Sequence, residues 1–134
     1  MRKGSKLSKK SRSREVKVDV KATRTLRTLS NEEAFHFYET IGKPTGQSAK
    51  SLHEFLDKIE SAKLESLVFH LERNDFKNWI ANALEDPKLA QKIEMLPIEH
   101  NSQLRTKIRT TIKARLKELE GTSVQVHEPV LASL

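Results

Sequence analysis

The middle of the chain carries two apolar stripes at helical spacing, separated by a short polar break. The first stripe consists of Leu64, Leu67, Val68 and Leu71, and the second of Phe76, Trp79, Ile80 and Ala83. In both stripes apolar residues recur at i, i+3, i+4 and i+7, which places them on one face of a helix. Residues 72–75 interrupt the period and supply a helix cap. The pattern predicts a hairpin of two helices at the centre of a small core.

Capping and stop signals predict further helices on both sides of this hairpin. Ser30 with Glu33 and Ser51 with Glu54 have the form of a capping box, and Pro87 follows the cap residue Asp86. The apolar faces after these caps are Ala34, Phe37, Tyr38 and Ile41, then Leu52, Phe55, Leu56 and Ile59, then Leu89, Ala90 and Ile93. A last helix over about 101–120 has the stripe Leu104, Ile108, Ile112, Leu116 and Leu119. We therefore predict an all-α fold, a single small bundle of about five helices over residues 30–120.

The two ends of the chain differ from this helical domain. Residues 1–14 contain seven basic residues, four serines and one glycine, and they cannot bury enough apolar surface to offset their chain entropy. We therefore expect the N-terminal arm, residues 1–29, to be largely disordered alone, and residues 121–134 to form an extended tail. Residues 15–22 and 123–127 alternate apolar and polar positions. These segments would either pair as a short two-stranded ribbon that joins the termini or remain extended linkers.

Composition excludes several classes of protein. The chain has no cysteine, which excludes disulfides, thiolate metal sites and cysteine nucleophiles. No apolar run reaches the roughly 18 residues that cross a bilayer, and the basic N-terminus is not followed by the apolar segment of a signal peptide. We expect a cytoplasmic protein. Because no metal-ligand cluster, nucleophile elbow or buried pair of carboxylates is evident, we expect no enzyme, no metal and no cofactor.

Positive charge is concentrated at the N-terminus. Residues 1–30 carry eleven basic and two acidic residues, a net charge of +9, whereas the other 104 residues have a net charge of −2. Flexible Lys and Arg side chains release counterions where they meet a polyanion. We therefore predict a nucleic-acid-associated protein, in which the arm binds phosphates of RNA or DNA without reading sequence, as part of a ribonucleoprotein or chromatin assembly. RNA is the preferred partner. The predicted contacts in the arm are Arg2, Lys3, Lys6, Lys9, Lys10, Arg12 and Arg14.

A second basic surface lies on the last predicted helix. Arg105, Arg109, Lys113 and Lys117 recur every four residues and form a ridge that could contact the same nucleic acid. Two alternatives remain open: both basic segments could serve only as solvated surface, and the chain could be a protein–protein interaction or adaptor module with no role in nucleic-acid binding.

The central sequence resembles a family of small, mainly archaeal and bacterial helical domains of unknown function. The likeness covers residues 34–119. It rests on Phe37-Tyr38, Gly42 with Thr45-Gly46, Ala49-x-Ser51-Leu52-x-x-Phe55, Ser66-x-x-Phe69-His70, Asn74-Asp75-Phe76-x-x-Trp79 and Leu89-Ala90. The resemblance implies a helical fold and no established activity. The basic arm lies outside it.

Polar residues within this block suggest a small pocket. Thr45, His70, Arg73 and Asp75 could together line a site for an anion or a peptide. The alternative is structural, with Asn74 or Asp75 as a helix cap and His70 bonded to a backbone carbonyl. The loop over residues 42–48 is not a P-loop, because its glycines are four residues apart and Gln47 stands at the lysine position.

Overall fold

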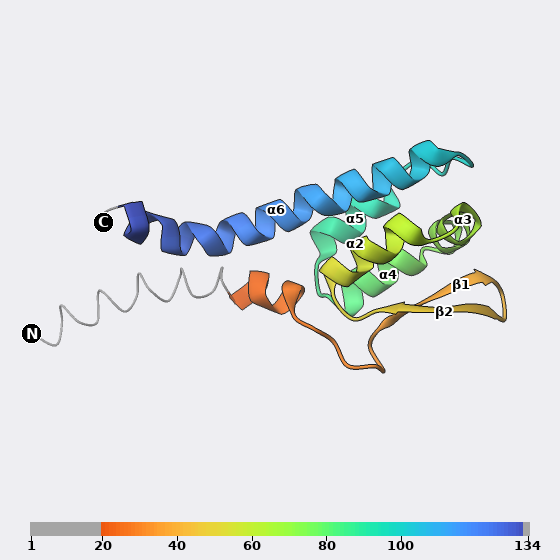
Figure 1. Ribbon diagram of the computed structural model, residues 1–134, viewed down its shortest axis with the longest axis horizontal. Coiled ribbons are helices and arrows are strands. Elements are labelled where there is room, and N and C mark those ends of the chain that lie inside the picture. Colours follow the sequence, from red (N-terminus) through yellow and green to blue (C-terminus); the bar gives the residue numbers. More distant parts are fainter. Residues whose placement is uncertain (1–19, 133–134) are drawn as a thin grey trace, which may run out of the picture.

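The computed structural model describes the backbone of residues 20–132 and the side chains of residues 20–121. The element order is β1 (Phe35–Thr40), β2 (Lys43–Ala49), α2 (Leu52–Ser61), α3 (Leu64–Glu72), α4 (Asp75–Asn82), α5 (Pro87–Glu94) and α6 (Ser102–Ala132). A further short helix spans residues 20–26. Figure 1 shows α6 along one side of α2, α4 and α5, with the β-hairpin and α3 at the end of the molecule away from the chain termini.

The prediction of an all-α fold is wrong, because residues 35–49 form a two-stranded antiparallel sheet and the fold is mixed α/β. Phe35 and Phe37 are buried whereas His36 is exposed, which is the two-residue period of a strand. Gly42 has φ +75° in the connection between the strands, a backbone conformation that glycine adopts without a steric penalty. The capping-box pair Ser30 and Glu33 therefore forms a turn before β1 and does not start a helix.

The helix α3 completes the outer edge of this small sheet. The backbone N–H of Tyr38 donates to Nε2 of His70 at 2.9 Å, and the Tyr38 carbonyl accepts from the Ser66 hydroxyl at 2.7 Å. Ser66 and His70 are four residues apart on α3, so they lie on the same face of the helix. Side chains thus satisfy strand groups that a third strand would otherwise bond, which lets a two-stranded sheet pack stably on helices.

The helices from α2 onward begin where the sequence predicts them. The Ser51 hydroxyl accepts from the Glu54 amide at 3.1 Å, and the Asp86 carboxylate accepts from the Leu89 amide at 3.3 Å, which confirms both predicted caps. The predicted α6 stripe is buried, with Leu104, Ile108 and Ile112 at 0% exposure.

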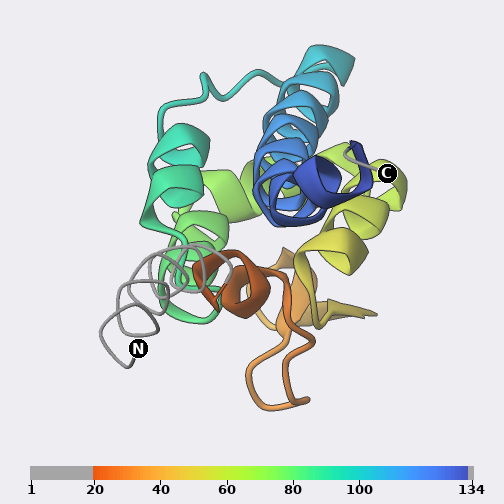
Figure 2. The same cartoon turned by 90° about the vertical axis from the view of Figure 1, so that its left-hand side faces the viewer.

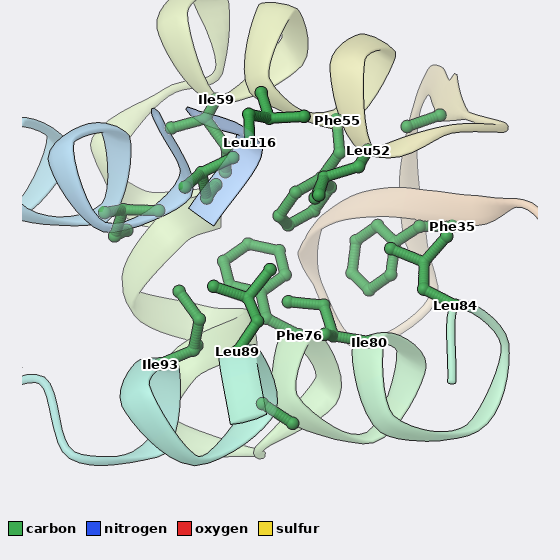
Figure 3. Packing of buried hydrophobic residues seen from close by; sticks show 14 of the residues in the cluster. Phe35, Leu52, Phe55, Ile59, Phe76, Ile80, Leu84, Leu89, Ile93 and Leu116 are labelled. Carbon is green, nitrogen blue, oxygen red and sulfur yellow. The ribbon is translucent and has the colours of Figure 1, made fainter. Parts of the chain in front are cut away.

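One continuous core joins all the elements. The rings of Phe55 from α2 and Phe76 from α4 meet edge to face at its centre, with centroids 5.1 Å apart, and the ring of Phe35 from β1 lies 5.1 Å from that of Phe76 (Figure 3). Ile80, Leu84, Leu89 and Ile93 close the opposite side. The hairpin is therefore part of the core and not an appendage.

Both boundaries of the folded region lie beyond the predicted ones. Residues 20–29, which the sequence assigns to the arm, contribute Ala22 and Leu29 to the core, with exposures of 2% and 4%. α6 runs through Gly121 to Ala132, where the sequence predicts an extended tail. The predicted terminal ribbon, over residues 15–22 and 123–127, is not formed in its described part, because residues 20–22 and 123–127 are helical; residues 15–19 lie outside the described residues.

Candidate functional site

Three of the four predicted pocket residues meet at the turn between α3 and α4. Nδ1 of His70 lies 2.9 Å from Oδ2 of Asp75, and Nε of Arg73 donates to the same oxygen at 3.1 Å. Asn74, between them, has the left-handed backbone conformation with φ 62°. This turn reverses the chain so that the Asp75 carboxylate points back at the end of α3.

The hydrogen bonds of His70 determine its tautomer. Because Nε2 accepts from the Tyr38 amide, the ring proton must be on Nδ1, where it donates to Asp75. The imidazole is buried, at 2% exposure, and burial lowers its pKa despite the opposing effect of Asp75. The neutral ring therefore connects β1, α3 and α4.

This geometry makes His70 a structural residue. Both ring nitrogens are occupied, so neither is available as an acid, a base or a ligand. The structural alternative predicted that His70 bonds a backbone carbonyl, but His70 accepts from a backbone amide. Asn74 occupies the N-cap position of α4, as that alternative allowed, but its side chain makes no capping hydrogen bond. His70, Arg73 and Asp75 are among the residues that line a cavity of about 400 Å³, and Arg73 stacks over the Phe69 ring at 5.1 Å.

Thr45, the fourth predicted pocket residue, lies at a different site. Its hydroxyl donates to the Phe37 carbonyl at 3.0 Å and accepts from the Gln47 amide at 3.0 Å. The strand register slips at this point, and Gly46 has φ +85°. Thr45 thus holds an irregular, bulged segment of β2, which also makes the strand edge less suited to pairing with another chain.

The predicted basic ridge on α6 divides into two halves. Arg105 donates to the carbonyls of Ile59, Glu60 and Ala62 at 3.0, 3.1 and 2.6 Å, so it caps the C-terminus of α2. Arg109 lies 3.4 Å from the Glu60 carboxylate.

Lys113 and Lys117 form the other half of the ridge. Both are exposed, and within the described residues neither has a hydrogen bond or an ion pair. The ridge therefore offers two cations to an external partner, where the sequence predicts four.

A buried ion pair connects α6 to the start of α5. Nε and a terminal nitrogen of Arg115 donate to the two oxygens of Asp86 at 2.8 and 3.1 Å, and the Asp86 side chain is only 2% exposed. Hydrogen bonds to Asp86 and Glu118 raise the pKa of Arg115, although burial alone would lower it. The sequence does not predict this pair, because nothing local links Arg115 to a residue 29 positions away.

A second cavity, of about 410 Å³, lies between β2 and the junction of α2 and α3. Its lining includes three lysines, Lys43, Lys58 and Lys63, and a single carboxylate, Glu39. The sequence does not predict this group of lysines, because its members come from separate elements.

Among the described residues there is neither a cluster of metal-binding side chains nor a membrane-spanning helix. No group of three or more His, Asp or Glu residues there is arranged to hold a metal ion. No helix in that part of the chain is long and apolar enough to cross a membrane. The arm residues Arg2, Lys3, Lys6, Lys9, Lys10, Arg12 and Arg14 lie outside the described residues.

Comparison with known proteins gave one match. No curated protein and no solved structure matches the chain. Residues 71–130 match the model of a protein family of unknown function, DUF5752. This match covers the end of α3, α4, α5 and most of α6, including the His70-adjacent turn and the Arg115–Asp86 pair. Over these residues the chain is similar to a family with no assigned activity, in keeping with the predicted resemblance to a domain of unknown function.

Proposed function

We propose that this protein binds RNA through phosphate contacts of its N-terminal arm, without reading sequence. The observation that carries the proposal is the segregation of charge. Seven basic residues stand in residues 1–14 with no acidic residue among them. In the folded part, by contrast, nine lysines and arginines form ion pairs within the chain, among them Arg24, Arg115 and Lys77. The largest group of basic residues without an acidic residue among them is therefore that of residues 1–14, which makes the arm the strongest candidate for binding a polyanion.

The helix over residues 20–26 gives the arm a defined origin. Nε of Arg24 donates to both oxygens of Glu85 at 2.8 Å, and Arg27 donates to the Ala83 carbonyl at 2.9 Å. The helix is thereby fixed to the junction of α4 and α5, and Ala22 is buried beneath it. An anchored arm loses less freedom on binding than a freely linked one, which favours cooperation with the folded surface.

Lys113 and Lys117 are the second contact of the proposal. In Figures 1 and 2 the helix over residues 20–26 lies closer to the C-terminal half of α6 than to its start at Ser102. In our proposal, RNA held by the arm continues along α6 to these exposed lysines. The absence of aromatic residues from the arm argues against base stacking, so affinity should depend on phosphates and not on sequence.

Two triple variants, each of which removes three positive charges, test the proposal. The first, Lys6→Gln with Lys9→Gln and Lys10→Gln, removes three cations from the arm. The control, Lys50→Gln with Lys88→Gln and Lys92→Gln, removes three from the folded domain, outside both the lysine-lined cavity and the α6 ridge. Fluorescence anisotropy with a mixed-sequence RNA at about 0.1 M salt should show roughly 10- to 100-fold weaker binding for the arm variant and less than about threefold for the control. Equal losses would contradict the arm as the binding element. Duplex DNA of the same length, measured in parallel, tests the preference for RNA.

We also propose that the family in question is a small, mainly archaeal domain family. In this proposal the likeness of the chain to the family extends N-terminal to the matched region and includes residues 34–70. Residues in this part complete the core of the matched part: Phe55 packs on Phe76, and Tyr38 bonds His70 next to the Asp75 turn. A fragment of residues 71–130 should therefore be unfolded by circular dichroism, whereas residues 20–132 should fold. A folded 71–130 fragment would refute this extension.

A protein-interaction module is the second candidate function. Met95 and Ile98, just after α5, are 74% and 40% exposed, and large exposed apolar side chains are common at protein interfaces. A protein partner that co-purifies from the native cells should be retained after deletion of residues 1–14 and lost in Met95→Glu. Loss with the deletion alone would assign the interaction to the arm.

A further inference from the structure

From the second cavity we propose a binding site for small oxyanions, separate from the RNA-binding arm. The site is formed by Lys43 of β2, Lys58 of α2 and Lys63 before α3, in a hollow of about 410 Å³. It would take a small molecule that carries a phosphate or a carboxylate on an apolar body.

Charge in the cavity favours an anion. The three lysines face one carboxylate, Glu39, so the lining has a net charge of +2. Nζ of Lys63 lies 3.0 Å from one oxygen of Glu39, whereas Lys43 is 4.0 Å from the other. The carboxylate thus holds Lys63 in place and leaves the Lys43 ammonium only weakly paired.

Lys58 lines the same cavity. Its Nζ donates to the Gln47 side-chain oxygen at 2.8 Å, and within the described residues it has no carboxylate partner. A neutral amide compensates an ammonium poorly, so an incoming oxyanion would be a stronger acceptor. Lys58 is partly buried, and its charge is therefore less screened than that of a fully exposed lysine.

The backbone around the cavity does not oppose an anion. The C-terminus of α2 reaches the cavity at Ser61 and Ala62, and its carbonyls would repel negative charge, but Arg105 donates to three carbonyls at that end. The N-terminus of α3 has no side-chain cap, and its partial positive charge adds to that of the lysines.

The apolar part of the lining sets the class of ligand. Phe37, Pro44 and Ala62 contribute to the cavity beside the lysines. A volume near 410 Å³ is at the small end of ligand sites. Inorganic phosphate alone would leave this surface uncovered, so a ligand with an aromatic or aliphatic body should bind better.

NMR titration of the ¹⁵N-labelled full chain with phenyl phosphate at constant ionic strength tests the site. We expect saturable shifts of the Thr45, Gln47 and Ser66 amides, with Kd near or below about 1 mM. Benzoate, titrated in parallel, distinguishes a preference for carboxylate from one for phosphate. The arm amides report any binding there separately, so failure of this site and failure of the RNA proposal are distinguishable.

Variants make the test specific. Lys58→Gln and Lys43→Gln should each weaken binding about tenfold, and Glu39→Gln should tighten it several-fold because it removes the only carboxylate and frees two lysines. Lys77→Gln, a half-exposed lysine paired with Glu94 outside the cavity, is the control and should bind as wild type. Binding of benzyl alcohol as tight as that of phenyl phosphate, linear shifts that do not saturate, or wild-type affinity in Lys58→Gln would each overturn the proposal.

Discussion

Replacement of His70 by phenylalanine tests the central connection of the fold. The phenylalanine ring keeps the aromatic packing, since the imidazole lies 4.9 Å from the Phe35 ring and 5.2 Å from the Phe76 ring. The substitution removes both hydrogen-bonding nitrogens. It therefore separates the contribution of the two hydrogen bonds from that of burying a ring.

The magnitude follows from what each partner loses. The Tyr38 amide loses its acceptor next to the core, which costs about 1–3 kcal/mol. Asp75 keeps its bond to Arg73 and is 28% exposed, so its loss should be at most about 1 kcal/mol. We expect His70→Phe to lower the free energy of unfolding by about 1–4 kcal/mol at pH 7.5, and the urea midpoint by roughly 0.5–2 M.

The effect of pH gives an independent signature. Burial lowers the pKa of His70 in the folded protein below its ordinary value of 6.5, so the unfolded chain binds the proton more readily. The stability due to the neutral ring is complete above pH 6.5 and is lost as the pH falls toward the folded-state pKa. The difference between wild type and His70→Phe should therefore shrink between pH 7.5 and pH 5.

Urea unfolding followed by far-ultraviolet circular dichroism measures both effects. His36→Phe is the matched control. His36 belongs to β1, is exposed and lines the same cavity as His70, so the substitution should change the free energy of unfolding by less than about 0.5 kcal/mol. Equal midpoints for His70→Phe and wild type at pH 7.5, or a difference that grows on acidification, would refute the assigned hydrogen bonds.

Three further substitutions test other contacts. Arg115→Met leaves the buried Asp86 carboxylate without its partner, and thermal unfolding should show a loss of about 3–5 kcal/mol; a change below about 1 kcal/mol would mean that Asp86 is solvated. Trp79→Phe removes the indole bond to the Glu33 carbonyl, 2.8 Å long, together with part of the ring system, and should cost about 1–2 kcal/mol in urea unfolding, whereas Trp79→Ala should cost about 3; equal losses would mean that the remaining phenyl ring contributes nothing. Thr45→Val removes the hydroxyl that holds the irregular part of β2, and amide hydrogen exchange in β2 should become faster while α6 is unaffected; unchanged exchange in β2 would contradict this role.

Elements set by local periodicity could be predicted from the sequence. The α6 stripe from Leu104 to Leu119 and the caps Ser51 and Asp86 depend on residues within one or two turns, and all are confirmed. The end of α6 was less predictable. Glycine is common just after the end of a helix, but Gly121 lies within α6.

The β-hairpin illustrates why the rest could not be predicted. Residues 34–41 satisfy both a helical period, through Ala34, Phe37 and Ile41, and a strand period, through Phe35 and Phe37. The bonds that favour the strand come from α3, 28 and 32 residues away, at Ser66 and His70. Long-range contacts thus override local preference, and periodicity alone contains no record of them.

The prediction of the candidate sites from the sequence was limited for the same reason, because they too depend on long-range contacts. A spacing of four residues predicted a common ridge for Arg105, Arg109, Lys113 and Lys117, but it could not show that α2 occupies the first two. The cavity lysines Lys43, Lys58 and Lys63 have no shared local pattern.

The dependence of RNA affinity on salt tests the proposed function most directly. If the arm neutralises about five phosphates and Lys113 and Lys117 about two more, the logarithm of the association constant should fall with the logarithm of salt concentration at a slope of about −5 to −6 for the full chain. Deletion of residues 1–14 should leave a slope between about −1 and −2, from Lys113 and Lys117. Affinity and slope that are unchanged by the deletion would contradict the proposal that the arm binds RNA.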